Sequence, residues 1–133
     1  MLIKKYKMEE DEFQLIRLLE NEGEEWSCYT AVDKSDKYKE ALNNSITYVA
    51  YEDDILCGYS RSLKDFDFYI YICDLLVVPE YRGRNIGREL MECIYNDYPE
   101  HIVYVMSDVD IYYEKQGYKR EGSVFEVTKD REM

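Results

Sequence analysis

The spacing of apolar residues along the first half of the chain predicts two helices followed by a strand hairpin. Apolar residues recur three and four positions apart between a short strand at 2–7 and Gly23, which predicts an amphipathic helix. A second helix is predicted at 35–43. The segments 46–51 and 55–62 are rich in aromatic and aliphatic residues instead, and the acidic turn between them is typical of a hairpin.

The second half of the chain alternates strands with helices. Residues 68–78 form a long apolar stretch, which predicts a central strand that is buried on both faces near its end. A helix with a clear apolar face follows at 86–94, then a strand at 102–106, a short helix at 109–116 and a final strand or hairpin arm at 118–127. This order, β-α-α-β-β-β-α-β-α-β, predicts an α/β fold with a mixed sheet and helices on both faces.

Length and charge narrow the functional classes. Residues 1–133 fit a single domain. The net charge is −12, from 29 acidic against 17 basic side chains, which argues against a nucleic-acid-binding surface. No apolar run approaches the roughly 20 residues of a membrane span. The first residues contain no signal-peptide core, so a cytoplasmic protein without a membrane partner is expected.

The chain offers few ligands for a metal ion. It has one histidine, His101, and its cysteines never form a C-x-x-C pair. Thiols with this spacing in a cytoplasmic protein are expected to be reduced and packed, so neither a metal site nor a disulfide framework is predicted. The four cysteines are Cys28, Cys57, Cys73 and Cys93.

Candidate chemistry concentrates in the loop that joins the central strand to the helix at 86–94. Pro79 ends the strand, and Gly83 and Gly87 let the backbone approach a ligand closely. The first N–H groups of the helix lack internal partners and carry the positive end of the helix dipole. These features predict an anion site suited to a phosphate or pyrophosphate, and the alternative is a plain turn with solvated arginines. The arginines are Arg82, Arg84 and Arg88.

The loop lacks the two common nucleotide-binding patterns, G-x-x-x-x-G-K-[ST] and G-x-G-x-x-G. Residues 77–90 instead resemble the acetyl-CoA-binding motif of the GNAT superfamily of N-acetyltransferases, whose core [Gln/Arg]-x-x-Gly-x-[Gly/Ala] falls on Arg82, Asn85 and Gly87. Asn85 replaces the first glycine of that core, and asparagine is the residue that best tolerates a positive φ after glycine. Residues 110–119 resemble the later Phe-Tyr-Glu-Lys-x-Gly-Phe segment of the family.

The resemblance implies a GNAT-like fold that uses acetyl-CoA as cosubstrate and no metal. In that family, backbone groups at the end of the central strand bind the pantetheine arm and the acetyl carbonyl, and the matching positions are Leu76, Val77 and Val78. The following loop and helix N-terminus bind the pyrophosphate. The positions implied for this second role are Arg82, Gly83, Arg84, Asn85, Ile86, Gly87 and Arg88.

The resemblance also implies catalytic residues. Tyr113 matches the tyrosine that protonates the departing CoA thiolate, whereas Tyr112 is expected to pack in the core. The amine must be neutral to attack, and Asp74 is the first candidate for the base because it interrupts an apolar strand just before the acetyl site. The alternative for Asp74 is a carboxylate satisfied by the backbone, and Glu24 and Glu25 are alternative bases.

Three functions are consistent with these residues. The first is transfer of acetyl from acetyl-CoA to the primary amine of a small-molecule or peptide acceptor by direct attack. The acidic and aromatic loop at 22–29 suits a cationic amine, through ion pairing and cation–π contact. The alternatives are a non-catalytic CoA-binding or protein-interaction module of the same fold, and a protein that binds another phosphate ester at this loop. A monomer and a homodimer both fit the sequence.

Overall fold

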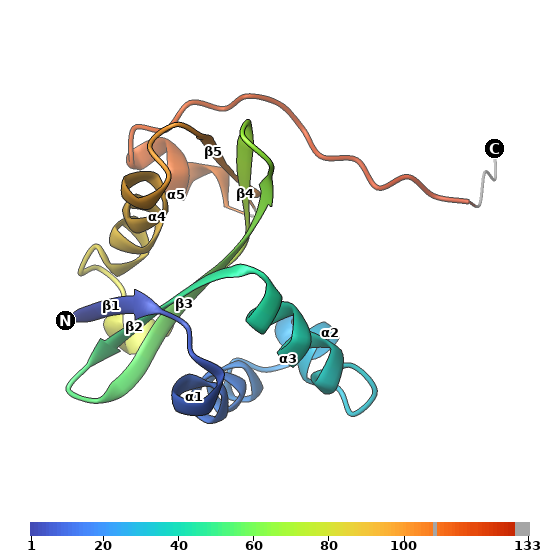
Figure 1. Cartoon of the computed structure of the whole chain (residues 1–133), viewed down its shortest axis with the longest axis vertical. Coiled ribbons are helices and arrows are strands. Elements are labelled where there is room, and N and C mark those ends of the chain that lie inside the picture. Colours follow the sequence, from blue (N-terminus) through green and yellow to red (C-terminus); the bar gives the residue numbers. More distant parts are fainter. Residues whose placement is uncertain (108, 130–133) are drawn as a thin grey trace.

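The computed structural model describes residues 1–107 and 109–129, which form a five-stranded mixed sheet with helices on both faces (Figure 1). The strands are β1 (Leu2–Lys5), β2 (Ile46–Glu52), β3 (Ile55–Asp65), β4 (Tyr69–Val77) and β5 (Ile102–Val105). They lie in the sheet in chain order. Each neighbouring pair from β1 to β4 is antiparallel, and β5 runs parallel to β4. The predicted α/β fold with a mixed sheet is therefore confirmed.

Two groups of helices cover opposite faces of the sheet. One face carries α1 (Met8–Asn21), α2 (Ser27–Thr30) and α3 (Ser35–Asn44), with a 3₁₀ turn over Glu24–Trp26 between α1 and α2. The other face carries α4 (Ile86–Asp97), which follows a 3₁₀ turn over Pro79–Tyr81, and α5 (Asp110–Lys115). None of the described helices is both long and apolar enough to cross a membrane.

Each face of the sheet has its own core. On the first face, Leu15 of α1 and Leu42 of α3 are buried against Tyr59 in β3. On the second face, Leu90 and Ile94 of α4 are buried against the sheet and exclude water from it. The apolar residues of each helix lie three and four positions apart, so a single face of the helix enters the core.

A gap opens between β4 and β5 where these parallel strands meet the loop before α4. Their register ends at the pair Ile72 and Val105, and the last backbone hydrogen bond runs from Met106 N to Ile72 O at 3.2 Å. β4 continues to Val77 beyond this point, whereas β5 ends at Val105. Among the described residues, the end of β4 therefore has a strand neighbour on the β3 side only.

A bulge in β4 changes which residues face each core. Arg61 pairs with Asp74 and Ser62 pairs with Ile72, so Cys73 is an extra residue on β4. Ile72 packs in the core beneath α4, and after the bulge Asp74 lies on the opposite face, beside α2 and α3. The bulge therefore places a carboxylate on the α1–α3 face, in the part of β4 that pairs with β3 but no longer with β5.

The prediction of a final strand at 118–127 is wrong. The described residues after α5 form no strand, and the chain runs away from the sheet beyond Tyr118 (Figure 1). Val124, Phe125 and Val127 are 76%, 85% and 95% exposed. The described sheet ends at β5, and none of its ladders pairs with this segment.

Candidate active site

The loop before α4 adopts the backbone conformation that its sequence predicts. Gly83 has φ 82°, and Asn85 has φ 62° and ψ 18°, in the left-handed region. Asn85 is the N-cap residue of α4, and its carbonyl accepts the Glu89 N–H at 3.0 Å. The side chain of Asn85 makes no capping hydrogen bond. Its role in the loop is therefore to permit the left-handed turn, as glycine would.

The N-terminus of α4 has the general properties that favour a bound anion. The N–H groups of the first helical turn, which starts at Ile86, have no partner within the helix and carry the positive end of the dipole. Gly87 lies in this turn, and a Cβ at residue 87 would lie 2.5 Å from the hydroxyl oxygen of Tyr112. The absence of a side chain at Gly87 therefore lets α5 contact the start of α4.

The three arginines of the segment have different partners. The Nε of Arg82 donates a hydrogen bond to Val77 O at 2.8 Å, which ties the loop to the end of β4. The guanidinium of Arg84 lies 5.1 Å from the centre of the Tyr81 ring. Arg88 forms an exposed ion pair with Glu92 at 2.8 Å, one turn further along α4. Arg82 and Arg84 thus belong to the loop itself, whereas Arg88 pairs along the helix surface.

The end of β4 offers backbone groups to the gap at alternate residues. Val78 N donates to Cys57 O at 2.9 Å, so this residue bonds toward β3. Successive residues of a strand bond to opposite sides, so Leu76 also faces β3, whereas Leu75 and Val77 face the gap. Of the predicted residues, Val77 is thus the one whose backbone groups lie on the gap side. The sequence analysis did not name Leu75 as a residue with backbone groups on the gap side. Counting back two residues from Val77 along the strand identifies it.

Tyr113 lies on α5, which ends in a Schellman motif. Gly117 has φ 86°, and the N–H groups of Gly117 and Tyr118 donate to Glu114 O and Tyr113 O. The rings of Tyr112 and Tyr113 are 5.0 Å apart in an edge-to-face arrangement, and both pack against the core beneath α4. Burial raises the pKa of Tyr112. The structure therefore places the Tyr112 hydroxyl at the first turn of α4, with Tyr113 beside Tyr112 on α5.

Asp74 is 5% exposed, and both of its carboxylate oxygens have hydrogen-bond donors. Oδ1 accepts from the Tyr29 hydroxyl at 2.8 Å. Oδ2 accepts from the Tyr38 hydroxyl and from the Nε of Arg61, each at 2.7 Å. Burial lowers the pKa of Arg61, but Asp74 outweighs this effect and raises it above its ordinary value. The donors to Asp74 are thus side chains, and the alternative of a carboxylate satisfied by the backbone finds no support in these contacts.

The other predicted acceptor residues lie close to this network. Glu24 and Glu25 are exposed on the 3₁₀ turn before α2. The Trp26 ring centre is 6.0 Å from that of Tyr29 and 6.3 Å from that of Tyr59. The turn therefore presents two carboxylates beside an aromatic surface that continues to Asp74.

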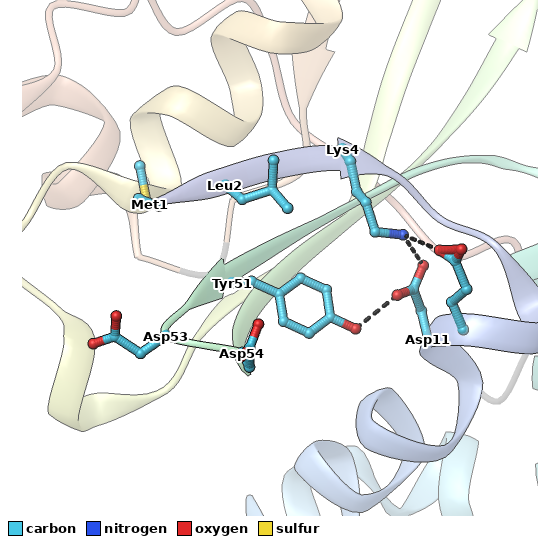
Figure 2. A pocket seen from close by; sticks show the side chains of 8 residues that line it. Met1, Leu2, Lys4, Asp11, Tyr51, Asp53 and Asp54 are labelled. Atoms are coloured by element: carbon cyan, nitrogen blue, oxygen red, sulfur yellow. Dashed lines mark hydrogen bonds and ion pairs between the residues drawn. The ribbon is translucent and has the colours of Figure 1, made fainter.

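A second polar cluster lies around a cavity of about 460 Å³ near the start of the chain, lined by β1, the first turn of α1 and the β2–β3 turn (Figure 2). Asp11 is 1% exposed there and accepts hydrogen bonds from Lys4 at 2.6 Å, Tyr51 at 2.6 Å and Lys7 N at 2.7 Å. Asp11 therefore ties β1 and β2 to the start of α1. None of the predicted site residues lines this cavity.

The arrangement at the end of β4 defines a class of protein: an open α/β sheet in which a helix N-terminus lies beside a strand end that lacks a neighbour on its β5 side. In residues 1–107 and 109–129, no group of three or more His, Cys, Asp or Glu side chains could hold a metal ion. The sequence matches the family model of the acetyltransferase (GNAT) domain over residues 43–120, which is more than half of the chain. The chain therefore belongs to the GNAT acetyltransferase family.

Solved structures from several organisms share this fold, and no curated protein matches the sequence. A GNAT family acetyltransferase from Streptococcus pneumoniae TIGR4 has a TM-score of 0.72 at 20% identity, with 97% of this chain and 98% of that chain covered. A predicted acetyltransferase from Clostridium acetobutylicum, solved with acetyl-CoA, has a TM-score of 0.71 at 19% identity, with 96% and 95% covered. Glucosamine-6-phosphate N-acetyltransferase from Arabidopsis thaliana has a TM-score of 0.68 at 17% identity, with 97% and 98% covered.

Proposed function

We propose that this protein transfers the acetyl group of acetyl-CoA to the primary amine of a small-molecule or peptide acceptor. The observation that carries the proposal is the position of two features at one end of β4. One is the strand edge left open where β5 ends, and the other is the left-handed turn at Asn85 that begins α4. A cosubstrate with an amide-rich arm and a pyrophosphate needs both.

The chain has groups suited to each part of acetyl-CoA. The backbone groups of Leu75 and the N–H of Val77 lie on the gap side of β4 and suit the amides of the pantetheine arm, whereas the Val77 carbonyl already accepts a hydrogen bond from Arg82. The N–H groups of the first turn of α4 are available to the pyrophosphate, with Arg82 and Arg84 supplying positive charge. Gly83 has open space around it, so the loop backbone is accessible to a bulky anion.

The reaction needs an acid and a base. The amine nitrogen attacks the thioester carbonyl carbon, the C–S bond breaks, and the departing sulfur takes a proton. We assign this acid role to Tyr113, because it matches the tyrosine of the family motif and lies on α5, which packs on the same core as α4. The amine loses a proton, for which Asp74 remains the first candidate, with Glu24 and Glu25 as alternatives.

The acceptor class is proposed from the surface around α2. Glu24, Glu25 and the ring of Trp26 suit an amine that carries additional positive charge. The structurally similar Arabidopsis thaliana protein is named for N-acetylation of an amino sugar. Amino sugars, polyamines and peptide amines are therefore the first acceptors to test.

One observation favours a second function, a CoA-binding or protein-interaction module without catalysis. The charge of Asp74 is compensated by Arg61, and each of its oxygens already accepts a hydrogen bond. A carboxylate held in this way also fits a purely structural role.

Amine-dependent release of CoA thiol from acetyl-CoA separates these functions. The test compares the wild type with Tyr113→Phe, and with Tyr95→Phe as a control at an exposed position on α4. We expect thiol release with at least one amine class, a loss of about 100-fold in Tyr113→Phe and unchanged activity in Tyr95→Phe. Acetyl-CoA binding without any amine-dependent release would establish the non-catalytic function.

A further inference from the structure

A chain of tyrosine hydroxyls leads from the interior of the protein to Asp74 and on to the partly exposed α2. Tyr38 donates to Asp74, and its hydroxyl also lies 2.7 Å from the hydroxyl of Tyr59. A hydroxyl has one hydrogen, so Tyr59 must be the donor in that second hydrogen bond. Tyr29 donates its hydrogen to the other oxygen of Asp74. Tyr29 and Tyr38 therefore donate directly to the carboxylate, and Tyr59 donates to Tyr38 behind it.

Tyr29 differs from the other two tyrosines in its exposure. Tyr59 is 0% exposed and Tyr38 is 4% exposed, whereas Tyr29 is only partly buried. Tyr29 therefore provides a route from Asp74 to the surface beside Trp26. Its hydrogen is committed to Asp74 and Arg61 also acts on this hydroxyl, so one remaining lone pair of the Tyr29 oxygen is left to accept a hydrogen bond from a ligand.

The Tyr29 ring is held rigidly in this position. It stacks on the Tyr38 ring at a centroid distance of 3.9 Å with an interplanar angle of 17°, and it contacts the Trp26 ring. Burial, with Asp74 as the second cause, raises the pKa of Tyr29 to about 12, so the hydroxyl keeps its hydrogen at neutral pH. A fixed, protonated phenol that donates to a carboxylate is a strengthened hydrogen-bond acceptor at its outer side.

We infer that Tyr29 binds the acceptor amine and connects it to Asp74; this inference rests on the proposed acetyl transfer. The Tyr29 oxygen accepts an N–H of the neutral amine and so orients the nitrogen lone pair. Asp74 lies beyond the bulge, in the part of β4 that no longer pairs with β5. It is two residues before Leu76, on the same face of the sheet. The amine is therefore held on the α1–α3 face beside the gap between β4 and β5.

The same geometry provides a path for the proton released in the reaction. When the nitrogen–carbon bond forms, the nitrogen becomes positively charged and must lose a proton. The N–H bond breaks as its proton moves to the Tyr29 oxygen, and the original Tyr29 hydrogen moves to Asp74. Tyr29 is a phenol before and after this step, and Asp74 gains one proton. Arg61 compensates the charge of the carboxylate, so that it is tolerated in this buried position.

The test compares Tyr29→Phe with Tyr38→Phe, because each variant removes one tyrosine hydrogen bond to the same carboxylate. Steady-state kinetics are measured against the amine and against acetyl-CoA, together with the melting temperature of each variant. We expect Tyr29→Phe to lower kcat/KM for the amine by about tenfold or more, with an unchanged KM for acetyl-CoA. Tyr38→Phe is expected to lower the melting temperature at least as much while changing kcat/KM for the amine less.

Each outcome decides the inference. A wild-type protein that acetylates no amine overturns the proposed function, and this inference with it. An active wild type whose kinetics toward the amine are the same in Tyr29→Phe overturns the inference and leaves the proposed function standing. Equal losses in both variants, in proportion to their losses in melting temperature, assign Tyr29 a structural role and also overturn it.

Discussion

The hydroxyl oxygen of Tyr112 lies 2.5 Å from the position that a Cβ on residue 87 would occupy. Real Cβ atoms do not approach an oxygen so closely, so a side chain at residue 87 would force the Tyr112 hydroxyl to shift. The contact joins the first turn of α4, where we propose the anion site, to α5, which carries Tyr113. One small residue therefore sets the spacing between the proposed pyrophosphate site and the proposed acid.

The variant Gly87→Ala tests this contact. Its Cβ would displace the partly buried Tyr112, which we expect to cost about 1–3 kcal/mol in the free energy of unfolding and to weaken acetyl-CoA binding. The Tyr112 Cζ atom is 3.6 Å from the same position, an ordinary contact distance. Removing the hydroxyl alone in Tyr112→Phe therefore makes room for the methyl group.

The double variant Gly87→Ala with Tyr112→Phe should recover most of the lost stability, measured by urea denaturation of all four proteins. The coupling between the two positions is the quantity of interest. Strictly additive losses in the double variant would contradict the proposed contact.

A second prediction concerns Asn85, which contributes to the loop by adopting the left-handed backbone conformation. Asn85→Ala should lower the free energy of unfolding by about 1–2 kcal/mol, since alanine is disfavoured in the left-handed region. Asn85→Gly should change it by only a few tenths of a kcal/mol, because the asparagine side chain makes no capping hydrogen bond. Thermal denaturation of the two variants measures the difference, and equal losses would show that the side chain matters instead.

The sequence was sufficient to predict the five strands, the longer helices α1, α3 and α4, the short helix α5 and the conformation of the loop before α4, but not the short helix α2 or the 3₁₀ turns. Apolar spacing identified α1 and α4 because each buries one helical face, and Asn85 was expected to tolerate the positive φ that it has. These features depend on neighbouring residues along the chain. They can therefore be predicted from the sequence without knowledge of the three-dimensional fold.

Features that depend on distant contacts could not be predicted. The bulge at Cys73 arises from how β4 pairs with β3, and it decides that Asp74 faces α2 and α3. The partners of Asp74 come from positions 13 to 45 residues away, which no local pattern connects. The absence of a strand at 118–127 depends likewise on what the sheet edge can bind. The catalytic roles of Tyr113 and Asp74 stay predictions.

A third prediction concerns the pH dependence of stability through Asp11. Burial alone raises the pKa of Asp11, but hydrogen bonds from Lys4, Tyr51 and Lys7 N outweigh it and lower the pKa below its ordinary value. A lowered folded-state pKa contributes stability that is fully present above the unfolded pKa of about 3.9 and is lost as the pH falls through the folded pKa.

The variant Asp11→Asn should therefore be less stable than the wild type by about 1–3 kcal/mol at pH 7. The difference should shrink as the pH is lowered below about 4, because the unfolded wild type binds a proton at Asp11 there, and the folded carboxylate follows at its lower pKa. Urea denaturation at several pH values measures both curves. A difference that is constant from pH 7 to pH 3 would mean that the charge of Asp11 contributes nothing.

Binding of acetyl-CoA, measured by isothermal titration calorimetry, tests the central claim most directly. The double variant Arg82→Ala with Arg84→Ala is compared with the wild type. The double variant Arg17→Ala with Lys37→Ala is the control, because it removes the same charge from exposed positions on α1 and α3. We predict that the wild type and the control bind acetyl-CoA alike and that the loop variant binds about 10–100-fold more weakly. A wild type that binds no acetyl-CoA, or a loop variant with wild-type affinity, would contradict the account.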